Sequence, residues 1–465
     1  MYYPNNEATV RAGYTNRHKP IILAEYRPND TKRIGKHLRK NLCHPTPWSH
    51  ERYIESMGDV GKIKQYTNTN ETHNKLGRIK THLNTFTKIE KTRTDKYKPP
   101  RLIQPRHQSF NIEYGRYIKP LEIALTKYHT NKYNFGKGNY DEIATRIDKL
   151  RKKYRYYTEG DHKTFDAHVT IEHLKMTHKF FQKCYNNFPA INKLARKTLT
   201  NTCVTTYGMK TKIKGTRMSG DVDTSIGNSL INLAILRECL YRLKIQGDAI
   251  VNGDDFILFT NKPVPTNIMV AMLRQYNMET DMQVSTTNIH TVEFCRTKFI
   301  YRNNGKPTMM FDPDRLHEIF GMTYQDVPCY LTYLIELSIA VKEINKNTII
   351  GLMIEKELLT HIKNIKPQKK QIKLEKLKVI VDRNIRRCVN RETGTEPETV
   401  LDYNQSILHA YKNILDLPRH LSRIRNTIIK NLEYYDGLTK NKIETSTAIA
   451  IKTIYISHRQ RKIIE

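Results

Sequence analysis

Two adjacent carboxylates, Asp254 and Asp255, lie between the apolar runs Ala249–Val251 and Phe256–Phe259. Asn252–Gly253 precedes them, and an Asn-Gly pair between apolar runs predicts a two-residue hairpin turn. Because burying an unpaired charge costs free energy, carboxylates at the tip of two buried strands predict a cationic partner. Mg²⁺ is the natural candidate, since one or two carboxylates hold it together with substrate phosphates. A solvated turn is the alternative that so short a motif leaves open.

A second acidic pair, Asp161 and Asp166, precedes a helix that we expect over Ile171–Phe181. The run Tyr156–Asp161 predicts a strand that ends near Asp161. A carboxylate at a strand end and another one turn later can face the same cavity. The alternative is that Asp166 caps the following helix.

A loop rich in small residues precedes an apolar helix that we expect over Ser229–Leu243. Thr224 and Asn228 are four residues apart and share one helix face. Small polar groups on one face of an otherwise apolar helix suit the recognition of hydroxyl groups. N-capping by Ser219 or Asp221 is the plainer explanation.

The stretch Lys96–Arg106 is basic and contains prolines, which break helices and favour extended backbone. Lys98, Arg101 and Arg106 would project from a stiff loop, where arginine binds phosphates in bidentate fashion and lysine acts as a point charge. A triphosphate would suit this set. An ordinary solvated basic loop is the alternative.

The chain has 465 residues, 79 Lys and Arg against 46 Asp and Glu, a net charge of +33 and a pI near 9.7. Its length allows roughly two or three domains. The charge predicts a polyanionic partner, first nucleic acid and second an anionic membrane. Because basic residues occur along most of the chain, a groove or channel is favoured over a basic tail.

The cysteines are odd in number and show no C-x-x-C pairing, which argues against a zinc site or a disulfide framework and favours a reducing compartment. They are Cys43, Cys184, Cys203, Cys239, Cys295, Cys329 and Cys388. The N-terminal residues lack the apolar core of a signal peptide, and no apolar run approaches the roughly 20 residues that span a bilayer. We therefore expect membrane contact to be peripheral or through a partner.

Further elements are expected from the pattern of apolar residues. Helices are predicted within His50–Lys64, Ile123–Tyr128, Asp141–Lys153, Asn187–Thr206 and Pro263–Asn277. A strand pair is predicted within Val292–Tyr301, with a turn at Asn303–Gly305. Residues 301–465 are expected to form a separate helical unit, with a basic segment at Lys363–Arg387.

A strand-end aspartate, a polar helix start and an Asp-Asp hairpin follow one another in the order of a polymerase palm. The sequence resembles viral RNA-dependent RNA polymerases, most of all the tombusvirus-like group of positive-strand RNA viruses, from about Lys96 to Tyr301. The corresponding motifs are motif A at Asp161 and Asp166, motif B at Ser219, Gly220, Thr224 and Asn228, motif C at Gly253–Asp255, motif E at Glu293–Cys295 and motif F at Lys98–Arg106.

The resemblance implies an α+β fold in the form of a right hand, with a small antiparallel palm sheet backed by helices. Residues 1–155 are expected to form N-terminal fingers that include the basic loop 96–106. Residues 156–300 would form the palm, with a helical fingers insertion at about 182–212, and residues 301–465 a helical thumb.

The resemblance also implies template-directed RNA synthesis with two Mg²⁺ ions about 4 Å apart, for which Mn²⁺ would substitute. The implied catalytic and metal-binding residues are Asp161, Asp254 and Asp255. The implied nucleotide-binding residues are Lys98, Arg101, Arg106, Asp166, Ser219, Thr224 and Asn228. The implied RNA-binding residues are Gly220, Glu293, Phe294, Cys295 and Arg296.

Template RNA, nascent RNA, nucleoside triphosphates and other viral replication proteins are the partners to expect, at membrane-associated replication complexes in the host cytoplasm. One feature departs from the family pattern. Motif D usually carries a lysine that protonates the leaving pyrophosphate, but no lysine lies between Lys262 and Lys298. Arg274 and His290 are the cationic candidates, and the general acid is left unassigned.

Two other classes compete with this interpretation. A reverse transcriptase shares the palm and both metal ions, but it usually places a bulky aromatic residue where this chain has polar groups for a 2′-hydroxyl. A non-enzymatic RNA-binding protein, such as a capsid or scaffold, explains the charge equally well. It does not explain three aspartates at metal-site positions, because carboxylates facing phosphates bring it no benefit.

Overall fold

The computed structural model describes residues 3–24, 28–90, 97–316, 320, 330–363 and 405–438, and it mixes helices with sheets. Its contacts divide the chain into two compact units. The first contains the described residues of Met1–Gly136 and Leu150–Thr287, and the second contains Lys137–Lys149 and the described residues from Asn288 onward. The assignment of residues 1–155, 156–300 and 301–465 to fingers, palm and thumb stays a prediction.

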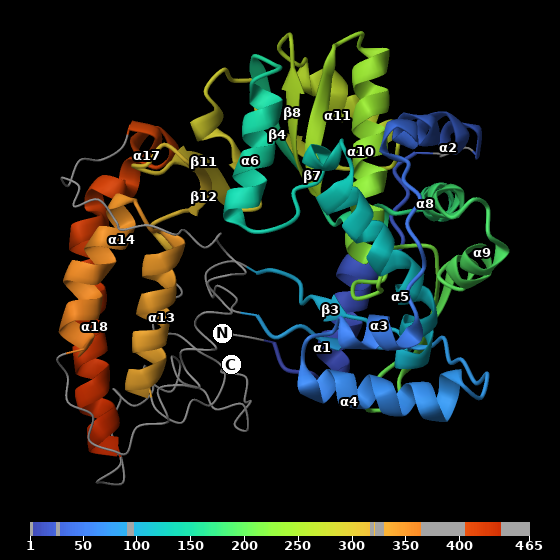
Figure 1. Cartoon of the computed structure of the whole chain (residues 1–465), viewed down its shortest axis with the longest axis horizontal. Coiled ribbons are helices and arrows are strands. Elements are labelled where there is room, and N and C mark those ends of the chain that lie inside the picture. The colour runs from blue at the N-terminus through green and yellow to red at the C-terminus, as the bar shows by residue number, and fades with distance from the viewer. Residues whose placement is uncertain are drawn as a thin grey trace. The chain divides into compact units, whose positions relative to one another are not determined.

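The first unit contains a four-stranded sheet in the order β7-β8-β4-β9, with every neighbouring pair antiparallel. The strands are β4 (Tyr156–His162), β7 (Gly247–Asn252), β8 (Asp255–Thr260) and β9 (Thr280–Met282). Helix α10 (Thr224–Arg242) packs against β7, and α11 (Thr266–Gln275) packs against β9 and α10 (Figure 1). The strands around both acidic pairs therefore form as the sequence predicts, whereas α10 begins five residues before the expected Ser229.

The turn between β7 and β8 differs by one residue from the prediction. Asn252 pairs with Asp255, so Gly253 and Asp254 form the two-residue turn instead of Asn252 and Gly253. Gly253 has a φ of +64°, which glycine adopts without strain. Strand pairing, which the local sequence does not reveal, has shifted the register and placed Asp254 at the tip.

The helix predicted over Ile123–Tyr128 is much longer in the structure. Helix α5 spans Gln108–Ile123 and a π-helical turn continues it through Tyr128. It contains Pro120, whose ring nitrogen leaves the Arg116 carbonyl without a helical partner. The Trp48 backbone N–H donates to that carbonyl at 2.9 Å, which satisfies the freed group.

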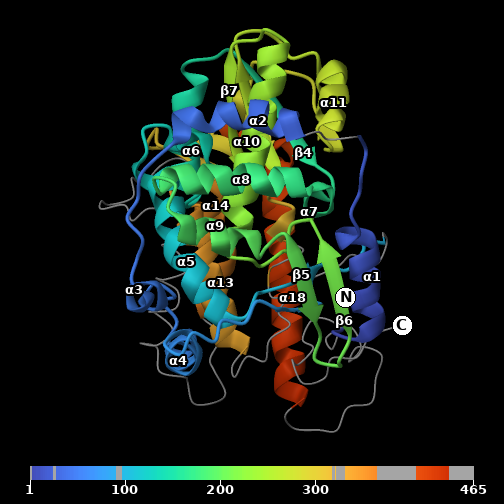
Figure 2. The ribbon, with the colours of Figure 1, turned by 90° about the vertical axis from the view of Figure 1, so that its right-hand side faces the viewer.

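The stretch expected to be helical over Asn187–Thr206 is helical only in part, and the expected helical insertion at 182–212 is corrected accordingly. It contains the end of α8 (Ile171–Cys184), then α9 (Pro189–Arg196), after which β5 (Thr200–Val204) pairs with β6 (Lys210–Lys214) as an antiparallel hairpin (Figure 2). Threonine and valine at alternate positions favour a strand here. Gly208, with a φ of +85°, lies in the turn.

The first unit contains further short helices and strands. They include α1 (Glu7–Gly13), η1 (Tyr14–His18), α2 (Pro28–Gly35), η2 (Lys36–Asn41), α3 (His50–Glu55), α4 (Val60–Thr69), β1 (Leu83–Asn84), β2 (Phe86–Thr87), β3 (Leu102–Ile103) and α7 (Phe165–His168). Strand β2 pairs with β3, and β1 pairs with β5. The main apolar core contains residues of α5, α8, α10 and the sheet.

The second unit contains the helix α6 (Tyr140–Arg151) up to Lys149, a three-stranded antiparallel sheet and helices of the C-terminal part. Its other elements include β10 (Glu293–Phe294), β11 (Thr297–Tyr301), β12 (Pro307–Phe311), α13 (Tyr330–Ile344), α14 (Ile349–Met353), α15 (Thr360–Lys363), α17 (Gln405–Ala410) and α18 (Leu417–Leu438). The turn predicted at Asn303–Gly305 joins β11 to β12. Apart from Lys363, the basic segment up to Arg387 lies outside the described residues.

In the parts of the chain that the structure describes, no helix has the length and apolar character needed to cross a membrane.

Candidate active site

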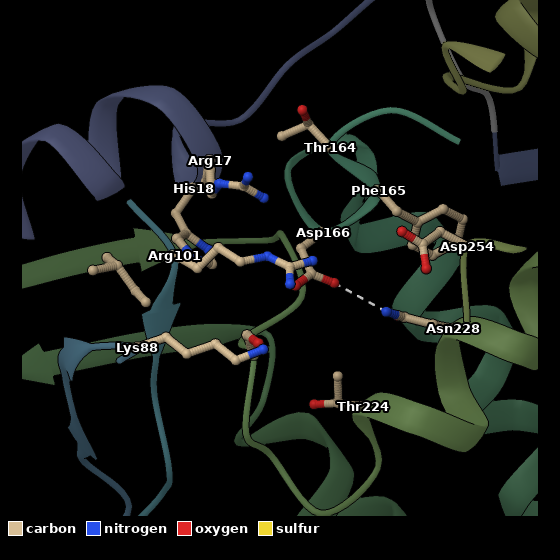
Figure 3. A pocket seen from close by; sticks show the side chains of 12 residues that line it. Arg17, His18, Lys88, Arg101, Thr164, Phe165, Asp166, Thr224, Asn228 and Asp254 are labelled. Carbon is tan, nitrogen blue, oxygen red and sulfur yellow. Dashed lines mark hydrogen bonds between the residues drawn. The ribbon is translucent and has the colours of Figure 1, made fainter. Parts of the chain in front are cut away.

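A cavity of about 230 Å³ in the first unit brings together most of the site residues that the sequence predicts (Figure 3). Its walls consist of Arg17, His18, Lys88, Arg101, Leu102, Thr164, Phe165, Asp166, Ser219, Thr224, Asn228 and Asp254. Motifs A, B, C and F thus each contribute at least one side chain. In Figure 3, Arg17, Lys88 and Arg101 lie toward the left, Asn228 and Asp254 lie toward the right, and Asp166 lies between the two groups.

Helix α10 fixes the hairpin that carries Asp254. The Ser229 hydroxyl accepts a hydrogen bond from the Gly253 N–H at 3.0 Å, and the Asn232 side-chain amide donates to the Gly253 carbonyl at 2.9 Å. Both partners lie on a buried helix. The part of α10 that follows motif B therefore supports the backbone of motif C.

A buried histidine completes this support. His162 Nε2 lies 2.9 Å from Asn232 Oδ1, and its Nδ1 lies 2.7 Å from Thr280 Oγ1. Burial lowers the pKa of His162 to about 4, so the ring is neutral at pH 7. Because the Asn232 oxygen only accepts, Nε2 carries the ring proton. His162 thus joins β4, α10 and β9 beside Asp161.

Of the three aspartates predicted to bind metal, Asp254 is the one that lines the cavity. Burial raises the pKa of Asp254 above its ordinary value, while its backbone hydrogen bonds and the nearby Arg101 and Arg17 act in the opposite direction. Asp161 and Asp255 lie directly opposite one another on β4 and β8 and are not part of the cavity wall.

The donor set fits Mg²⁺ in its chemistry. All three aspartates offer carboxylate oxygens, and a cation would offset the cost of ionising Asp254 in a buried position. Within the described ranges, no three His, Cys, Asp or Glu side chains gather closely enough to hold an ion by themselves. In proteins, Mg²⁺ is usually held by one or two carboxylates, with substrate phosphates as further ligands.

Asp166 and Asn228 form a direct pair at the cavity wall. The Asn228 amide nitrogen donates to Asp166 Oδ1 at 2.9 Å, as the dashed line in Figure 3 shows. Burial raises the pKa of Asp166 to about 6, although this hydrogen bond lowers it. The alternative that Asp166 caps the next helix is wrong, because Thr170 provides the N-cap of α8.

Thr224 and Ser219 also line the cavity, as expected. The Thr224 hydroxyl donates to the Met218 carbonyl at 2.8 Å, which holds the loop at the start of α10. Neither Ser219 nor Asp221 caps this helix, whose N-cap position is Asp223.

Two cations of the cavity, Arg17 and Lys88, were missed by the sequence reasoning. Arg17 belongs to η1, in a polar region that matches no motif. Lys88 follows β2, and its backbone N–H donates to the Arg101 carbonyl at 2.8 Å. This pairing of the two backbones places the two side chains close together. Only this strand pairing would have revealed Lys88. Lys98 does not line the cavity, and its carbonyl accepts a hydrogen bond from the Tyr3 hydroxyl.

Arg106 has a different position from the one the sequence suggests. Its side chain is fully buried and bonded to both carboxylate oxygens of Asp221 at 2.8 and 2.7 Å. It also donates to Asn201 Oδ1 at 2.6 Å and to the Thr81 carbonyl at 2.8 Å. With these donors engaged away from the cavity, Arg106 cannot reach a triphosphate, and we correct that assignment to a structural role.

Removing Arg106 should destabilise the protein. Arg106→Met leaves Asp221 buried without its partner, and breaking a buried pair in this way costs about 3–5 kcal/mol. Urea denaturation would measure the change in the free energy of unfolding. The matched control, Arg101→Met at a side chain that is 44% exposed, should stay within about 0.5 kcal/mol of wild type. Equal stabilities of the two variants would contradict the structural role.

The loop that contains Gly220 packs against motif F. The Gln104 N–H donates to the Ser219 carbonyl at 2.6 Å, and Gly220 has a φ of +119°. A Cβ at Gly220 would lie 3.1–3.3 Å from backbone atoms of Gln104 and Pro105. Glycine is therefore required at this position for close packing. Its contact with RNA stays a prediction.

The motif E residues belong to the second unit. Cys295 and Arg296, with φ values of +51° and +60°, form the two-residue turn between β10 and β11, where Phe294 pairs with Thr297. Positive φ at both positions is typical of a type I′ turn. The Phe294 side chain is 1% exposed, so the expected contact of this ring with RNA is corrected to a packing role. The expected contacts of Glu293, Cys295 and Arg296 stay predictions.

Neither candidate for the motif D cation lines the cavity. Arg274 is exposed near the end of α11. His290 belongs to the second unit, where its Nδ1 lies 2.8 Å from the Phe299 carbonyl oxygen. The general acid therefore has no assignment.

Carboxylates, cations and amide groups around one cavity, beside an antiparallel sheet, are the groups that a nucleotide-binding enzyme uses. The chain belongs to the viral RNA-dependent RNA polymerase family, whose profile matches residues 15–395. This confirms the family resemblance seen in the sequence.

The chain is also similar to individual RNA-directed RNA polymerases. It is 30% identical over 242 residues to that of Groundnut rosette virus (strain MC1), covering 49% of this chain and 28% of the relative. It is 30% identical over 284 residues to that of Tobacco necrosis virus (strain A), covering 56% of this chain and 38% of the relative. It is 29% identical over 278 residues to that of Tomato bushy stunt virus (strain Cherry), covering 56% of this chain and 34% of the relative. The chain thus spans 28% to 38% of the length of these relatives.

Proposed function

We propose that the protein copies an RNA template into RNA by transferring nucleotides from nucleoside triphosphates to a growing 3′ end. The observation that carries this proposal is the cavity in which Asp254, the Asp166–Asn228 pair and the cations Arg17 and Arg101 face one another. Family membership supports the same activity.

In this proposal, each wall of the cavity binds one part of the nucleotide. Arg101, with Lys88 and Arg17, holds the triphosphate, and Asp166 with Asn228 holds the ribose. Because the cations come from separate elements that pack together, they are positioned before the substrate arrives, which lowers the entropy cost of binding.

Asp161, Asp254 and Asp255 would hold two Mg²⁺ ions, with Mn²⁺ as a substitute. When bound, such ions lower the pKa of the attacking 3′-hydroxyl and stabilise the leaving pyrophosphate. The chain contributes the rigid hairpin through Ser229, Asn232 and His162, so that these carboxylates keep their places during the reaction.

We further propose the right-hand arrangement of fingers (1–155), palm (156–300) and thumb (301–465) for this chain. Ser219 and Gly220 would position the nucleotide and the template backbone, and Glu293, Cys295 and Arg296 would contact RNA. Template and nascent RNA, nucleoside triphosphates and other viral replication proteins would be its partners. It would act in the host cytoplasm at membrane-associated replication complexes, with membrane contact that is peripheral or through a partner.

Primer-free RNA synthesis tests the proposed activity. The purified chain is incubated with a short RNA template, labelled ribonucleotides and Mg²⁺ or Mn²⁺, and the products are separated by size. Template-length RNA that requires the divalent ion supports the proposal. A protein that binds the template but makes no product with either ion, with or without a primer, would favour the non-enzymatic RNA-binding alternative.

The choice of sugar separates an RNA polymerase from a reverse transcriptase. A site that hydrogen-bonds a hydroxyl discriminates strongly against a substrate lacking it, because its polar groups are left unpaired. We expect ribonucleotides to be favoured over deoxyribonucleotides by about 10²-fold or more. Asn228→Ala should narrow this preference more than it weakens RNA binding, as single-nucleotide incorporation with matched ribo- and deoxyribonucleotides would show. Equal use of both sugars by the wild type would overturn the assignment as an RNA polymerase and favour a reverse transcriptase.

Arg101→Ala should raise the nucleotide KM by about tenfold or more and lower kcat, because one charge-assisted contact to phosphate is lost. Affinity for template RNA should change less. Lys98→Ala is the matched control, since Lys98 lies in the same loop outside the cavity wall. Steady-state incorporation kinetics and filter binding would measure both quantities. A collapse of template affinity at unchanged KM would assign the loop to the template path instead.

A further inference from the structure

A buried arginine lies behind the Asp166–Asn228 pair and outside the cavity wall. Arg217 is 1% exposed, and its Nε–H donates to Asn228 Oδ1 at 3.0 Å. Its backbone N–H also donates to the Asp166 carbonyl at 2.9 Å. Arg217 therefore contacts both members of the pair without reaching the space that a nucleotide would occupy.

The contact with Arg217 decides which way the Asn228 amide faces. A side-chain amide has an oxygen that accepts and a nitrogen that donates, and its two orientations have nearly the same shape. Arginine has only donors, so its Nε–H holds the Asn228 oxygen on the buried side. The amide nitrogen is then directed to Asp166, to which it donates at 2.9 Å. The reverse orientation would set the amide oxygen against the carboxylate.

The guanidinium of Arg217 forms an ion pair with Asp223 and packs against Gly227. Arg217 Nη1 lies 2.9 Å from Asp223 Oδ1, and the Tyr114 hydroxyl donates to the other oxygen of Asp223 at 3.0 Å. Burial acts to raise the pKa of Asp223, but Arg217 and other neighbours bring this pKa below its ordinary value. A Cβ at Gly227 would lie 2.4 Å from Arg217 Nη2. The guanidinium thus occupies the space that a larger residue at 227 would fill.

We propose that Arg217 is a positioning residue for sugar selection, which fixes the Asn228 amide so that its nitrogen faces Asp166, and that Gly227 is glycine to make room for the guanidinium. This inference rests on the proposed role of Asp166 and Asn228 in binding ribose. It assigns ribose discrimination to a side chain that does not touch the substrate.

Gly227→Ala tests this with little risk to the fold. Alanine is favoured over glycine inside a helix by about 1 kcal/mol, and the atom that must move is the end of a long side chain. Arg217→Lys is the second variant, which keeps the charge beside Asp223 but loses the planar donor set. The matched control is Gly61→Ala on α4, where only the exposed Asp59 side chain lies near the added methyl group.

The readout is the ratio of kcat/KM for a ribonucleotide to that for the matching deoxyribonucleotide, on one primed template with the full chain. We expect Gly227→Ala and Arg217→Lys to lower this ratio by about tenfold, the size of a lost hydrogen bond to a charged group. The deoxyribonucleotide value should change much less. Adding Gly227→Ala to Asn228→Ala should cause no further fall, because contacting residues in one network are not additive.

The outcomes separate the inference from the function on which it rests. An unchanged ratio in Asn228→Ala would overturn the proposed ribose site, and with it this inference. A lowered ratio in Asn228→Ala, with an unchanged ratio in Gly227→Ala, would overturn the role of Arg217 alone. An equal loss for both sugars in Gly227→Ala would likewise overturn it, because it would indicate a general effect on the fold. If Arg217→Lys fails to fold, Gly227→Ala decides the question.

Discussion

Asp254→Ala should lose nucleotide addition almost completely, with a fall in rate of about 10³-fold or more. Of the three aspartates proposed to bind metal, Asp254 is the one that lines the cavity, and its burial raises the pKa of the carboxyl group. Its loss removes the charge that a metal ion needs at the tip of the hairpin. RNA binding should stay close to wild type, because most affinity for RNA comes from Lys and Arg contacts to phosphates. Single-nucleotide incorporation and filter binding would measure the two effects separately.

Asp281→Ala provides a matched control for this loss. Asp281 lies opposite Asp161 on β9, is exposed, and forms an ion pair with Lys163 at 2.9 Å. Removing it takes away a carboxylate of the same sheet outside the cavity, and we expect activity within about threefold of wild type, as for most surface changes. Asp255→Asn should be milder than Asp254→Ala and shift the metal preference toward Mn²⁺. Near-normal incorporation by Asp254→Ala, or equal inactivity of Asp281→Ala, would refute the assignment.

The strands and helices around the catalytic motifs were predictable because their apolar patterns are strong. The runs on either side of Asp254 form β7 and β8, and the apolar stretch after Asn228 forms α10. Turn register was not predictable to the residue, since the pairing of Asn252 with Asp255 depends on both strands. The region around Thr200 was assigned to helix because its partner strand β6 is needed to show the hairpin.

Arg101 and Arg106 show where local sequence stops being informative about a site. Both follow prolines in the same basic loop, and nothing in the loop separates their roles. The difference comes from Asp221, which is 115 residues away in the sequence and pairs with Arg106 in the interior. Such a partner is visible only once the chain is folded.

The opposite error occurred with Arg17 and Lys88, which belong to no motif but line the cavity. Each reaches the cavity through an element whose position depends on contacts distant in sequence, such as that of Lys88 with Arg101.

Arg217 was likewise overlooked, because a buried arginine two residues before Ser219 looks from the sequence like one more surface cation. Its buried contacts with Asn228 on α10 and Asp166 on α7 show a structural role that its residue type alone does not reveal.

Affinity for RNA should fall steeply with salt, by about 10³- to 10⁵-fold between 50 and 200 mM if 6–10 phosphates are neutralised. The net charge of +33 comes from basic residues along most of the chain. Each phosphate contact releases condensed counterions, so the slope of log affinity against log salt counts these contacts. Filter binding of one RNA across a salt series would give this slope, and RNAs of different sequence should give nearly the same one.

The Asp254→Ala variant should keep this salt slope even though its activity is lost, because the substitution removes a carboxylate and leaves the cations in place. It thereby separates the charge that binds RNA from the charge that carries out the chemistry. A slope near zero in the wild type would indicate that phosphate contacts contribute little, and would argue against a basic channel for the template. A slope that changes strongly in Asp254→Ala would instead indicate that the hairpin itself shapes the RNA path.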